Sequence, residues 1–292
     1  MKLDKERVMP IIRAALKEDI GRGDITTSGL IGKFESRKAC IVAHEDCVVC
    51  ALNICEWVMA QVDYSVRFKP NCKDGTSVGT GKELAFLEGH AGSILRAERT
   101  MLNFLAFLSG IATKTRQFAD KARPYGVKVM DTRKTLPLLR YLEKYAVSIG
   151  GGVNHRMGLY DQVLIKDNHI NVARSALCVV RNGKTTLKDL IEEARRKSLK
   201  GTTIEIEVTT INEFNDALSG RPDIIMLDNM SSSDVKACME IRRLSKIKPL
   251  LEVSGGIDID NVEEYAKTRV DMISVGSLTS SVRAIDMSLD IL

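Results

Sequence analysis

The sequence predicts an α/β protein in which a mixed N-terminal unit precedes a barrel of parallel strands. From Gly126 onward, short apolar strands alternate with helical segments, which is typical of parallel sheets. Polar residues stand at the carboxyl ends of successive strands, and a barrel brings such ends together at one mouth. Within Ile204–Val208 apolar residues alternate with Glu205 and Glu207, so one face packs on helices and the other points into the barrel.

Length and charge set limits on the class of protein. The 292 residues are enough for one large domain or two ordinary ones with a buried core. A balance of 43 Lys and Arg against 38 Asp and Glu gives +5, without a basic tail or an aromatic-rich basic stripe. We therefore expect no nucleic-acid partner. No apolar segment reaches membrane-spanning length and the N-terminus lacks a signal-like apolar stretch, so we expect a cytoplasmic protein with no membrane partner.

The seven cysteines are expected to be reduced thiols, because their number is odd and they are scattered along the chain. Cys47, Cys50 and Cys55 have a spacing that resembles a metal site. No second matching pair follows, however, and the residues between Cys47 and Cys50 are typical of a strand. Buried apolar cysteines are therefore the favoured interpretation.

The first hundred or so residues have the pattern of an α+β unit. A helix is expected over Val8–Glu18, ending at Gly21-Arg-Gly23, with a turn at 24–27. Short strands and one helix follow, separated by Gly, Pro, Asn and Asp. The expected strands are Lys38–Ala43, Cys47–Ala51, Tyr64–Phe68, Thr76–Gly79 and Glu83–Leu87, and the helix is Asn53–Val62.

An amphipathic helix is predicted over Ser93–Leu108, with Arg96 and Arg99 on its polar face. Ser109-Gly110-Ile111 interrupts this pattern, and a further helix is expected over Lys114–Arg123. We place a domain boundary near Gly110.

About seven strands are expected after this boundary. They are Val127–Met130, a short strand around Val153, Gln162–Ile165, Ile204–Val208, Ile224–Leu227, Leu250–Val253 and Met272–Val275. The expected helices are Leu136–Tyr145, Leu187–Lys197, Ile211–Leu218, Ser233–Arg243 and Val262–Lys267.

Basic side chains interrupt apolar runs between Asp131 and Ile170. They are Arg133, Lys134, His155, Arg156 and Lys166. Arg offers a planar fork and Lys a compact charge, so the mixture suits a ligand with several acidic groups. A solvated surface is the alternative.

The interior carboxylates of Glu205 and Glu207 need cations or a metal, and Lys134 and Lys166 at neighbouring strand ends are candidates. Glu252 is expected to face the same interior. A purely structural ion-pair network is the alternative.

Two glycine loops follow late strands, at Ser254-Gly255-Gly256 and at Gly276-Ser277. Loops in these positions of a barrel commonly bind phosphate through backbone N–H groups. Together with the basic side chains between Asp131 and Ile170, here called the basic ring, these loops indicate a phosphorylated sugar held near a second anion.

Long motifs in this chain resemble the quinolinate phosphoribosyltransferase family. The similarity runs from Glu18 to Thr279 and is carried by Glu98-Arg-Thr100, Asp131-Thr-Arg-Lys-Thr135, Gly150-Gly-Gly-Val-Asn-His-Arg156 and Leu164-Ile-Lys-Asp-Asn-His169. After Gly276 the chain continues to Ser280-Ser281, where many members place His or another polar residue.

The resemblance implies an N-terminal α/β sandwich domain (1–110, rejoined by about 280–292) and an open seven-stranded α/β barrel (111–279). It implies homodimers, or larger assemblies such as a hexamer of dimers. The implied reaction joins quinolinate to 5-phosphoribosyl 1-pyrophosphate with Mg²⁺ and no organic cofactor. It releases pyrophosphate and CO₂, and forms nicotinate mononucleotide for de novo NAD synthesis.

Residue roles carry over from the same motifs. Quinolinate binding is implied for Arg133, Lys134, His155, Arg156 and Lys166, with Arg99 from the partner chain. Catalytic roles are implied for Lys134, Lys166, Glu207 and Asp228, the last two also holding Mg²⁺. Binding of the phosphoribosyl pyrophosphate is implied for Glu207, Asp228, Ser254, Gly255, Gly256 and Gly276.

Three other functions stay open. One is the molybdenum-operon-associated paralogue, whose members lack the intact His-Arg and Lys-Asp-Asn-His set. Another is a barrel aldolase that forms a Schiff base through Lys166. The third is a non-catalytic protein that binds an anionic metabolite.

Overall fold

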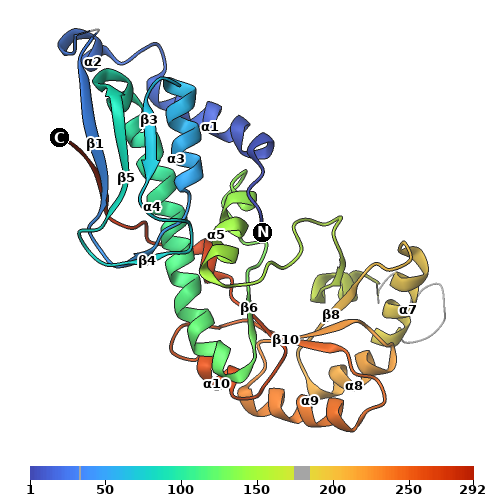
Figure 1. The fold of residues 1–292 in the computed structure, drawn as a ribbon. Helices are drawn as coiled ribbons and strands as arrows, with labels where there is room; N and C mark the ends of the chain where they lie inside the picture. The colour runs from blue at the N-terminus through green and yellow to red at the C-terminus, as the bar shows by residue number, and fades with distance from the viewer. Residues whose placement is uncertain (33, 174–184) are drawn as a thin grey trace. The chain divides into compact units, whose positions relative to one another are not determined.

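The computed structural model describes residues 1–32, 34–173 and 185–292, so Cys178 lies outside the described residues. The described chain forms two compact units, drawn as a ribbon in Figure 1. The first unit holds Met1–Arg116, Thr135–Gly152 and Leu278–Leu292. The second holds Gln117–Lys134 and Val153–Ser277.

The first unit is built on a four-stranded antiparallel sheet in the order β12-β1-β5-β3. Its strands are β1 (Ser36–Ala43), β3 (Arg67–Pro70), β5 (Glu83–His90) and β12 (Met287–Ile291). Because β12 pairs with β1, the last residues of the chain complete the N-terminal sheet. A small second sheet joins β2 (Cys47–Val48) to β4 (Ser77–Val78), so the predicted strand at Cys47–Ala51 is shorter than expected.

Helices α1 (Lys5–Ile20), α3 (Leu52–Val62) and α4 (Ala91–Ala122) stand beside this sheet (Figure 1). The predicted stop of the first helix is confirmed, since Gly21 ends α1 with φ 53°. The predicted turn at 24–27 is wrong. Asp24 accepts the backbone N–H of Thr27 and thereby caps a short helix, α2 (Ile25–Leu30).

Helix α4 is continuous, so the predicted break at Gly110 is wrong. A Cβ on Gly110 would lie 2.3 Å from the backbone oxygen of Arg283. The glycine therefore admits a crossing chain segment and does not end the helix. The predicted faces of α4 are confirmed, because Met101 and Leu105 are fully buried while Arg99 is exposed.

Helix α5 (Arg140–Gly150) belongs to the first unit and packs on α4. A Cβ on Gly150 would lie 2.4 Å from the backbone oxygen of Ala112, and Arg116 donates to the Gly150 carbonyl at 3.0 Å. The helix begins later than the predicted Leu136, because Leu138 has φ 66° and cannot continue a right-handed helix.

The second unit contains a six-stranded parallel sheet in the order β6-β11-β10-β9-β8-β7. Its strands are β6 (Lys128–Met130), β7 (Val163–Ile165), β8 (Ile204–Val208), β9 (Ile224–Asp228), β10 (Leu250–Ser254) and β11 (Met272–Ser274). Val153 forms a single parallel bridge to Met130 beyond β6, in the position of the seventh strand. No pairing of described residues joins Val153 to β7. The predicted α/β class with an open barrel is confirmed.

Helices line one side of these strands in Figure 1. They are α7 (Leu187–Lys197), α8 (Ile211–Ser219), α9 (Ser232–Leu244) and α10 (Val262–Ala266). A 3₁₀ turn η1 (Arg123–Tyr125) precedes β6, and a short helix α11 (Ser277–Ser280) follows β11 and continues into the first unit. Ile204, Ile206 and Val208 of β8 are buried, as are Phe214 and Val235 of the helices, which forms the apolar layer of this unit.

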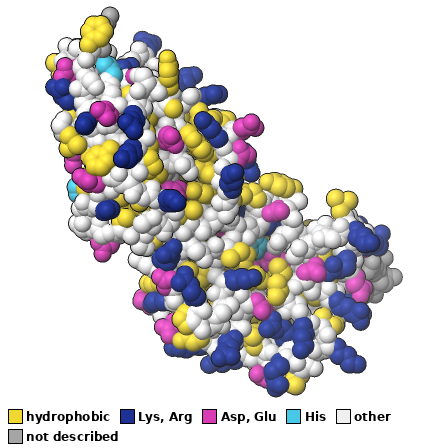
Figure 2. Space-filling model, in the orientation of Figure 1, with side chains coloured by type: hydrophobic (Ala, Val, Ile, Leu, Met, Phe, Trp, Pro, Cys, Tyr) yellow, Lys and Arg dark blue, Asp and Glu magenta, His cyan; other side chains and the backbone are white. Residues whose placement is uncertain are grey.

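In the described parts of the chain, no helix is both long enough and apolar enough to cross a membrane. Lys and Arg side chains are spread over the visible face in Figure 2 and do not gather into one basic patch. This distribution agrees with the mild net charge of +5.

Candidate active site

Polar side chains gather at the carboxyl ends of the parallel strands of the second unit. Lys166 follows β7, Glu207 lies near the end of β8, and Asp228 ends β9. The Nζ of Lys166 donates to Oε2 of Glu207 at 2.9 Å, which confirms the predicted pairing of an interior carboxylate with this lysine. Burial raises the pKa of Glu207, and the nearby charge of Asp228 raises it further against the effect of Lys166. The two carboxylates therefore lie close together at adjacent strand ends.

The predicted glycine loops lie at the ends of β10 and β11. Gly255 has φ 91°, and a Cβ there would lie 2.3 Å from Oδ1 of Asn229. The backbone N–H of Asn229 donates to the Ser254 carbonyl at 2.8 Å, so the loops after β9 and β10 are joined. Only glycine fits this close approach without strain.

Gly276 is in contact with one of the predicted cations. A Cβ on Gly276 would lie 3.1 Å from Cδ of Lys134 and 3.7 Å from its Nζ. The Lys134 side chain therefore lies over the second glycine loop. This contact brings a predicted phosphate loop and a predicted catalytic lysine together.

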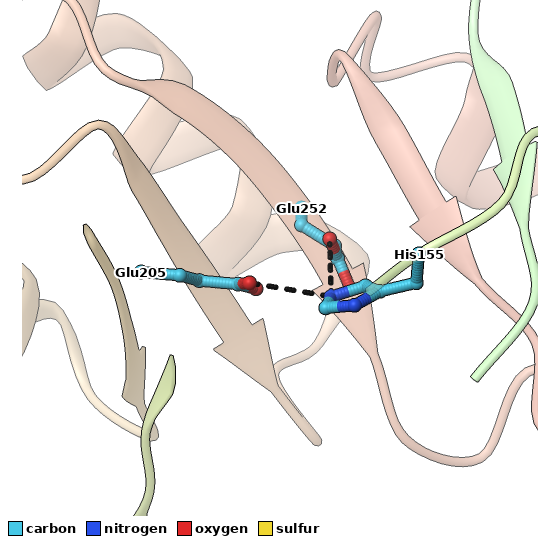
Figure 3. Close-up of side chains that lie close together, drawn as sticks. All are labelled: His155, Glu205 and Glu252. Atoms are coloured by element: carbon cyan, nitrogen blue, oxygen red, sulfur yellow. Dashed lines mark ion pairs between the residues drawn. The ribbon is translucent and has the colours of Figure 1, made fainter. Parts of the chain in front are cut away.

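A buried cluster lies between strands β8 and β10 and the segment that follows Val153 (Figure 3). Nε2 of His155 is 3.2 Å from Oε2 of Glu205 and 3.6 Å from Oε2 of Glu252. Both glutamates are fully buried, so the predicted interior position of Glu252 is confirmed. Burial, followed by the charge of Glu205, raises the pKa of Glu252 to about 8.

These three residues have the side-chain types of a metal site, and their ligand atoms lie within 4.8 Å of one another. The other ring nitrogen of His155 argues against that use. Its Nδ1 receives the backbone N–H of Arg156 at 2.7 Å, and a backbone N–H can only donate. A neutral imidazole then carries its proton on Nε2, which faces the carboxylates and has no lone pair for a cation.

Arg156 is 94% buried, as its relative exposure of 6% shows. Its Nη1 donates to the Gln162 carbonyl at 3.1 Å, whereas its buried Nε has no hydrogen-bond partner among the described residues. Burial and then the charge of Arg133 lower the pKa of Arg156. A buried guanidinium that also feels the charge of the half-buried Arg133 favours a bound anion.

The second unit thus contains all but one of the predicted site residues. The exception is Arg99, which lies on α4 in the first unit, with its Nη2 3.8 Å from Oε1 of Glu98. The sequence reasoning missed Gln162, Asn229 and Ser274, which hold Glu205, the Gly255 loop and Glu252. Only Asn229 carried a local signal, since Asn tolerates the positive φ of 53° found there.

Comparisons with known proteins show the family of the chain. The family model "Quinolinate phosphoribosyl transferase, N-terminal domain" matches residues 24–109, and the corresponding C-terminal domain model matches residues 111–290. The chain is 43% identical to a probable nicotinate-nucleotide pyrophosphorylase [carboxylating] of Methanocaldococcus jannaschii, over 98% of each chain. It is 37% identical to the nicotinate-nucleotide pyrophosphorylase [carboxylating] of Mycobacterium leprae, over 96% of this chain and 95% of the relative.

The fold matches as well. The solved structure of the nicotinate-nucleotide pyrophosphorylase from Francisella tularensis superposes with a TM-score of 0.90 at 37% identity. The match covers 100% of this chain and 98% of that one.

Proposed function

The chain belongs to the quinolinate phosphoribosyltransferase family, and we infer that it is a carboxylating nicotinate-nucleotide pyrophosphorylase, a pentosyltransferase of NAD biosynthesis. The reaction transfers the phosphoribosyl group of 5-phosphoribosyl 1-pyrophosphate to the ring nitrogen of quinolinate. Pyrophosphate and CO₂ leave, and nicotinate mononucleotide remains. The structural observation that supports this most directly is the buried Arg156 fork beside Arg133, in the same unit as the Lys166–Glu207 pair.

Quinolinate carries two carboxylates, and the basic ring is proposed to bind them. Arg133, Arg156 and Lys166 are the proposed cations of this ring, with Lys134 beside it and Arg99 from a partner chain, and His155 is proposed to act in it through its contact with Arg156. The buried Nε of Arg156 supports the assignment, because an unsatisfied buried donor costs about 1–3 kcal/mol unless a ligand accepts its hydrogen bond.

The phosphoribosyl pyrophosphate is proposed to lie along the ends of β8 to β11. Ser254, Gly255, Gly256 and Gly276 would receive the 5-phosphate through backbone N–H groups, and Lys134 would supply a charge beside it. Glu207 and Asp228 would bind the ribose hydroxyls.

The same two carboxylates fit Mg²⁺, a hard cation that prefers oxygen ligands, because they stand at the ends of the adjacent strands β8 and β9 and the charge of one acts on the other. When bound there, Mg²⁺ would neutralise charge on the pyrophosphate. We include this metal and its two ligands in the proposal.

The proposed residues can perform the chemistry without a protein nucleophile. As the bond to pyrophosphate breaks, positive charge develops on the ribose carbon, and the carboxylates of Glu207 and Asp228 offset it. The alkylated pyridine ring is then cationic, so its nitrogen stabilises the electron pair left on C2 when the C2 carboxylate leaves as CO₂, and C2 then takes up a proton from solvent. The fixed guanidinium groups of Arg133 and Arg156 hold the ring in place for that step.

A homodimer is part of the proposal, with Arg99 reaching the site of the partner subunit. Apolar side chains exposed on this single chain support an interface. In the first unit they include Ile25, Leu30 and Phe34, with exposures of 89%, 78% and 97%, and in the second Tyr160 with 83%. The cytoplasm is the proposed location, and it is consistent with the six described cysteines, which form no disulfide.

One assay tests the proposed function. Purified protein is supplied with quinolinate, 5-phosphoribosyl 1-pyrophosphate and Mg²⁺, and the release of CO₂ and nicotinate mononucleotide is measured. Binding of quinolinate without product would favour the metabolite-binding alternative. The Schiff-base alternative has less support, because the Lys166 side chain is 43% exposed and in an ion pair, whereas burial in an apolar pocket is what activates such a lysine.

A further inference from the structure

Arg156 is held in a closed ring of interactions that includes Glu205. Its backbone N–H donates to Nδ1 of His155 at 2.7 Å, and Nε2 of the same imidazole lies 3.2 Å from Oε2 of Glu205. That carboxylate oxygen also accepts the side-chain amide of Gln162. The backbone carbonyl of Gln162 in turn accepts a hydrogen bond from Nη1 of Arg156 at 3.1 Å, which closes the ring of interactions. Both the main chain and the guanidinium of Arg156 are therefore fixed by the same circuit.

Glu252 contacts this circuit from β10, which is separated from β8 by one strand, β9. Its Oε2 lies 3.6 Å from Nε2 of His155, and its Oε1 accepts the hydroxyl of Ser274. The backbone N–H of His155 donates to Oδ1 of Asp131 at 2.9 Å. His155 is thus held at its backbone and at both ring nitrogens.

Two fully buried carboxyl groups beside one imidazole are costly, since an apolar pair of the same volume would often be more stable. Neither Glu205 nor Glu252 has a part in the reaction as described above. Oε1 of Glu205 and Oε2 of Glu252 also lack hydrogen-bond partners among the described residues. The arrangement therefore calls for a reason other than stability.

We propose that Glu205 and Glu252 are positioning residues, which keep the proton of His155 on Nε2 and thereby fix the Arg156 fork for a substrate carboxylate. This inference rests on the proposed function, because it assigns the carboxylate of quinolinate to Arg156. Neither glutamate contacts the substrate. Their effect passes through the imidazole and through Gln162.

The physical basis is the choice between the two neutral forms of imidazole. With acceptors at Nε2, the proton stays there and the lone pair of Nδ1 receives the Arg156 N–H. If those acceptors were removed, nothing would hold the proton on Nε2. In the other neutral form the proton is on Nδ1 and faces the Arg156 N–H, so two donors would oppose each other. The bond to Arg156 would break, and the guanidinium would lose its fixed position. Because bidentate recognition of a carboxylate depends on that position, quinolinate binding is the step expected to suffer.

The test compares Glu205→Leu, which has no acceptor, with Glu205→Gln, which keeps a carbonyl oxygen. We expect Glu205→Leu to raise the KM for quinolinate by about 10–100-fold while the KM for 5-phosphoribosyl 1-pyrophosphate changes by less than about twofold. Glu205→Gln should recover most of this loss. The same pair of changes at Glu252 should act in the same direction. Glu240→Gln, at an exposed ion pair on α9, is the matched control for loss of a carboxylate.

A second readout needs no turnover. Nitrogen NMR of protein with labelled histidine reports the tautomer of each ring, and His155→Asn assigns the signal of His155 among the four histidines. We expect the Nε2–H form at neutral pH in the wild type and its loss in Glu205→Leu. A wild-type His155 in the Nδ1–H form would overturn the proposal.

An unchanged quinolinate KM in folded Glu205→Leu and Glu252→Leu would also overturn it, as would equal rises in both KM values. If both Leu variants fail to fold, the wild-type tautomer still decides. Failure of the proposed function can be distinguished from failure of this inference. In the first case the wild-type protein releases no CO₂, whichever tautomer His155 has.

Discussion

The Nζ of Lys166 lies 2.9 Å from Oε2 of Glu207, across the ends of the neighbouring parallel strands β7 and β8. The pair places a negative charge where positive charge is proposed to develop on the ribose. We expect Glu207→Gln to lower kcat by about 10²–10³-fold, in the range measured for loss of one electrostatic contact to a transition state. The KM for quinolinate should change only a few-fold.

Steady-state kinetics with each substrate varied in turn would measure this effect. Glu240→Gln serves as the control for removal of an exposed carboxylate from the same unit. A collapse of quinolinate binding with normal kcat would instead place Glu207 on the quinolinate side of the site.

Nicotinate should be a poor substrate, because it lacks one of the two carboxylates that the basic ring is proposed to bind. A cation such as Arg156, which is 6% exposed, would be left unpaired in the complex. Sites of this kind discriminate by about 10⁴-fold or more against an analogue that lacks the partner group. Competition between quinolinate and nicotinate, read as the ratio of their kcat/KM values, checks this, and comparable values would refute the proposed ring.

Gly255→Ala should weaken binding of 5-phosphoribosyl 1-pyrophosphate and lower stability. The new Cβ would lie 2.3 Å from Oδ1 and 2.9 Å from N of Asn229, at a residue with φ 91°. We expect a loss of about 1–3 kcal/mol in the free energy of unfolding from the strained backbone and the contact. The KM for the phosphoribosyl donor should rise by about 10-fold.

Gly126→Ala is the matched control. Gly126 also has a positive φ, 75°, but a Cβ there would meet nothing within 4 Å. It should therefore show the backbone strain alone and leave the KM unchanged. Equal KM values for the two variants would exclude the Gly255 loop from the donor site.

Arg99 is proposed to act in the partner's site, so two inactive variants should complement each other. Arg99→Ala and Lys166→Ala homodimers would each lack one cation at every site. In a mixed twofold dimer, one site carries both changes and the other carries neither. Random reassortment of equal amounts should thus restore roughly a quarter of wild-type activity.

Refolding the two variants together, with each refolded alone as control, makes this measurable. Recovery well below that level, with hybrid formation shown by differently tagged chains, would remove Arg99 from the partner's site.

Stability should depend on pH through Glu252. Burial and the charge of Glu205 raise its pKa from 4.5 to about 8 in the folded chain, so the folded state holds this proton more tightly than the unfolded state. The resulting stabilisation is complete below about pH 4.5 and is lost as pH rises through about 8, at about 1.4 kcal/mol per unit of pKa difference.

Glu252→Gln cannot titrate at this position and should lack that dependence. Denaturant unfolding of both proteins at pH 5 and pH 9 would show the wild type losing several kcal/mol more than the variant over this interval. Parallel curves would mean that Glu252 has an ordinary pKa.

Local periodicity was enough to predict the strands and the candidate charges. In β8 the alternation of apolar residues with Glu205 and Glu207 has a period of two, which any extended chain expresses without knowledge of its neighbours. Lys166 and Asp228 were recognised for a related reason, since each follows or ends an apolar run. The long family motifs then supplied the reaction class, which no periodicity contains.

Local patterns misled where the role of a residue depended on a contact that its composition does not show. Gly110 has the composition of a helix stop, yet α4 continues through it because the glycine admits the backbone of Arg283. Asp24 was read as part of a turn, although its side chain caps α2. In both cases the deciding partner was a backbone atom whose position the pattern did not encode.

The sequence by itself determined the alternation of strands and helices, the sign of the charges at the strand ends and the family of the chain. Only the tertiary structure decided which atoms those charges contact. Gln162 meets Glu205 across 43 residues and Ser274 meets Glu252 across 22, because β7 pairs with β8 and β10 pairs with β11 in the parallel sheet. The groups that face the ring of His155 were decided in the same way, since Glu205 and Glu252 lie far from it in sequence. Hydrogen bonds are directional and short-ranged. The spacing of residues in a sequence can therefore indicate which residues belong to a site, but it cannot predict which of their atoms form hydrogen bonds.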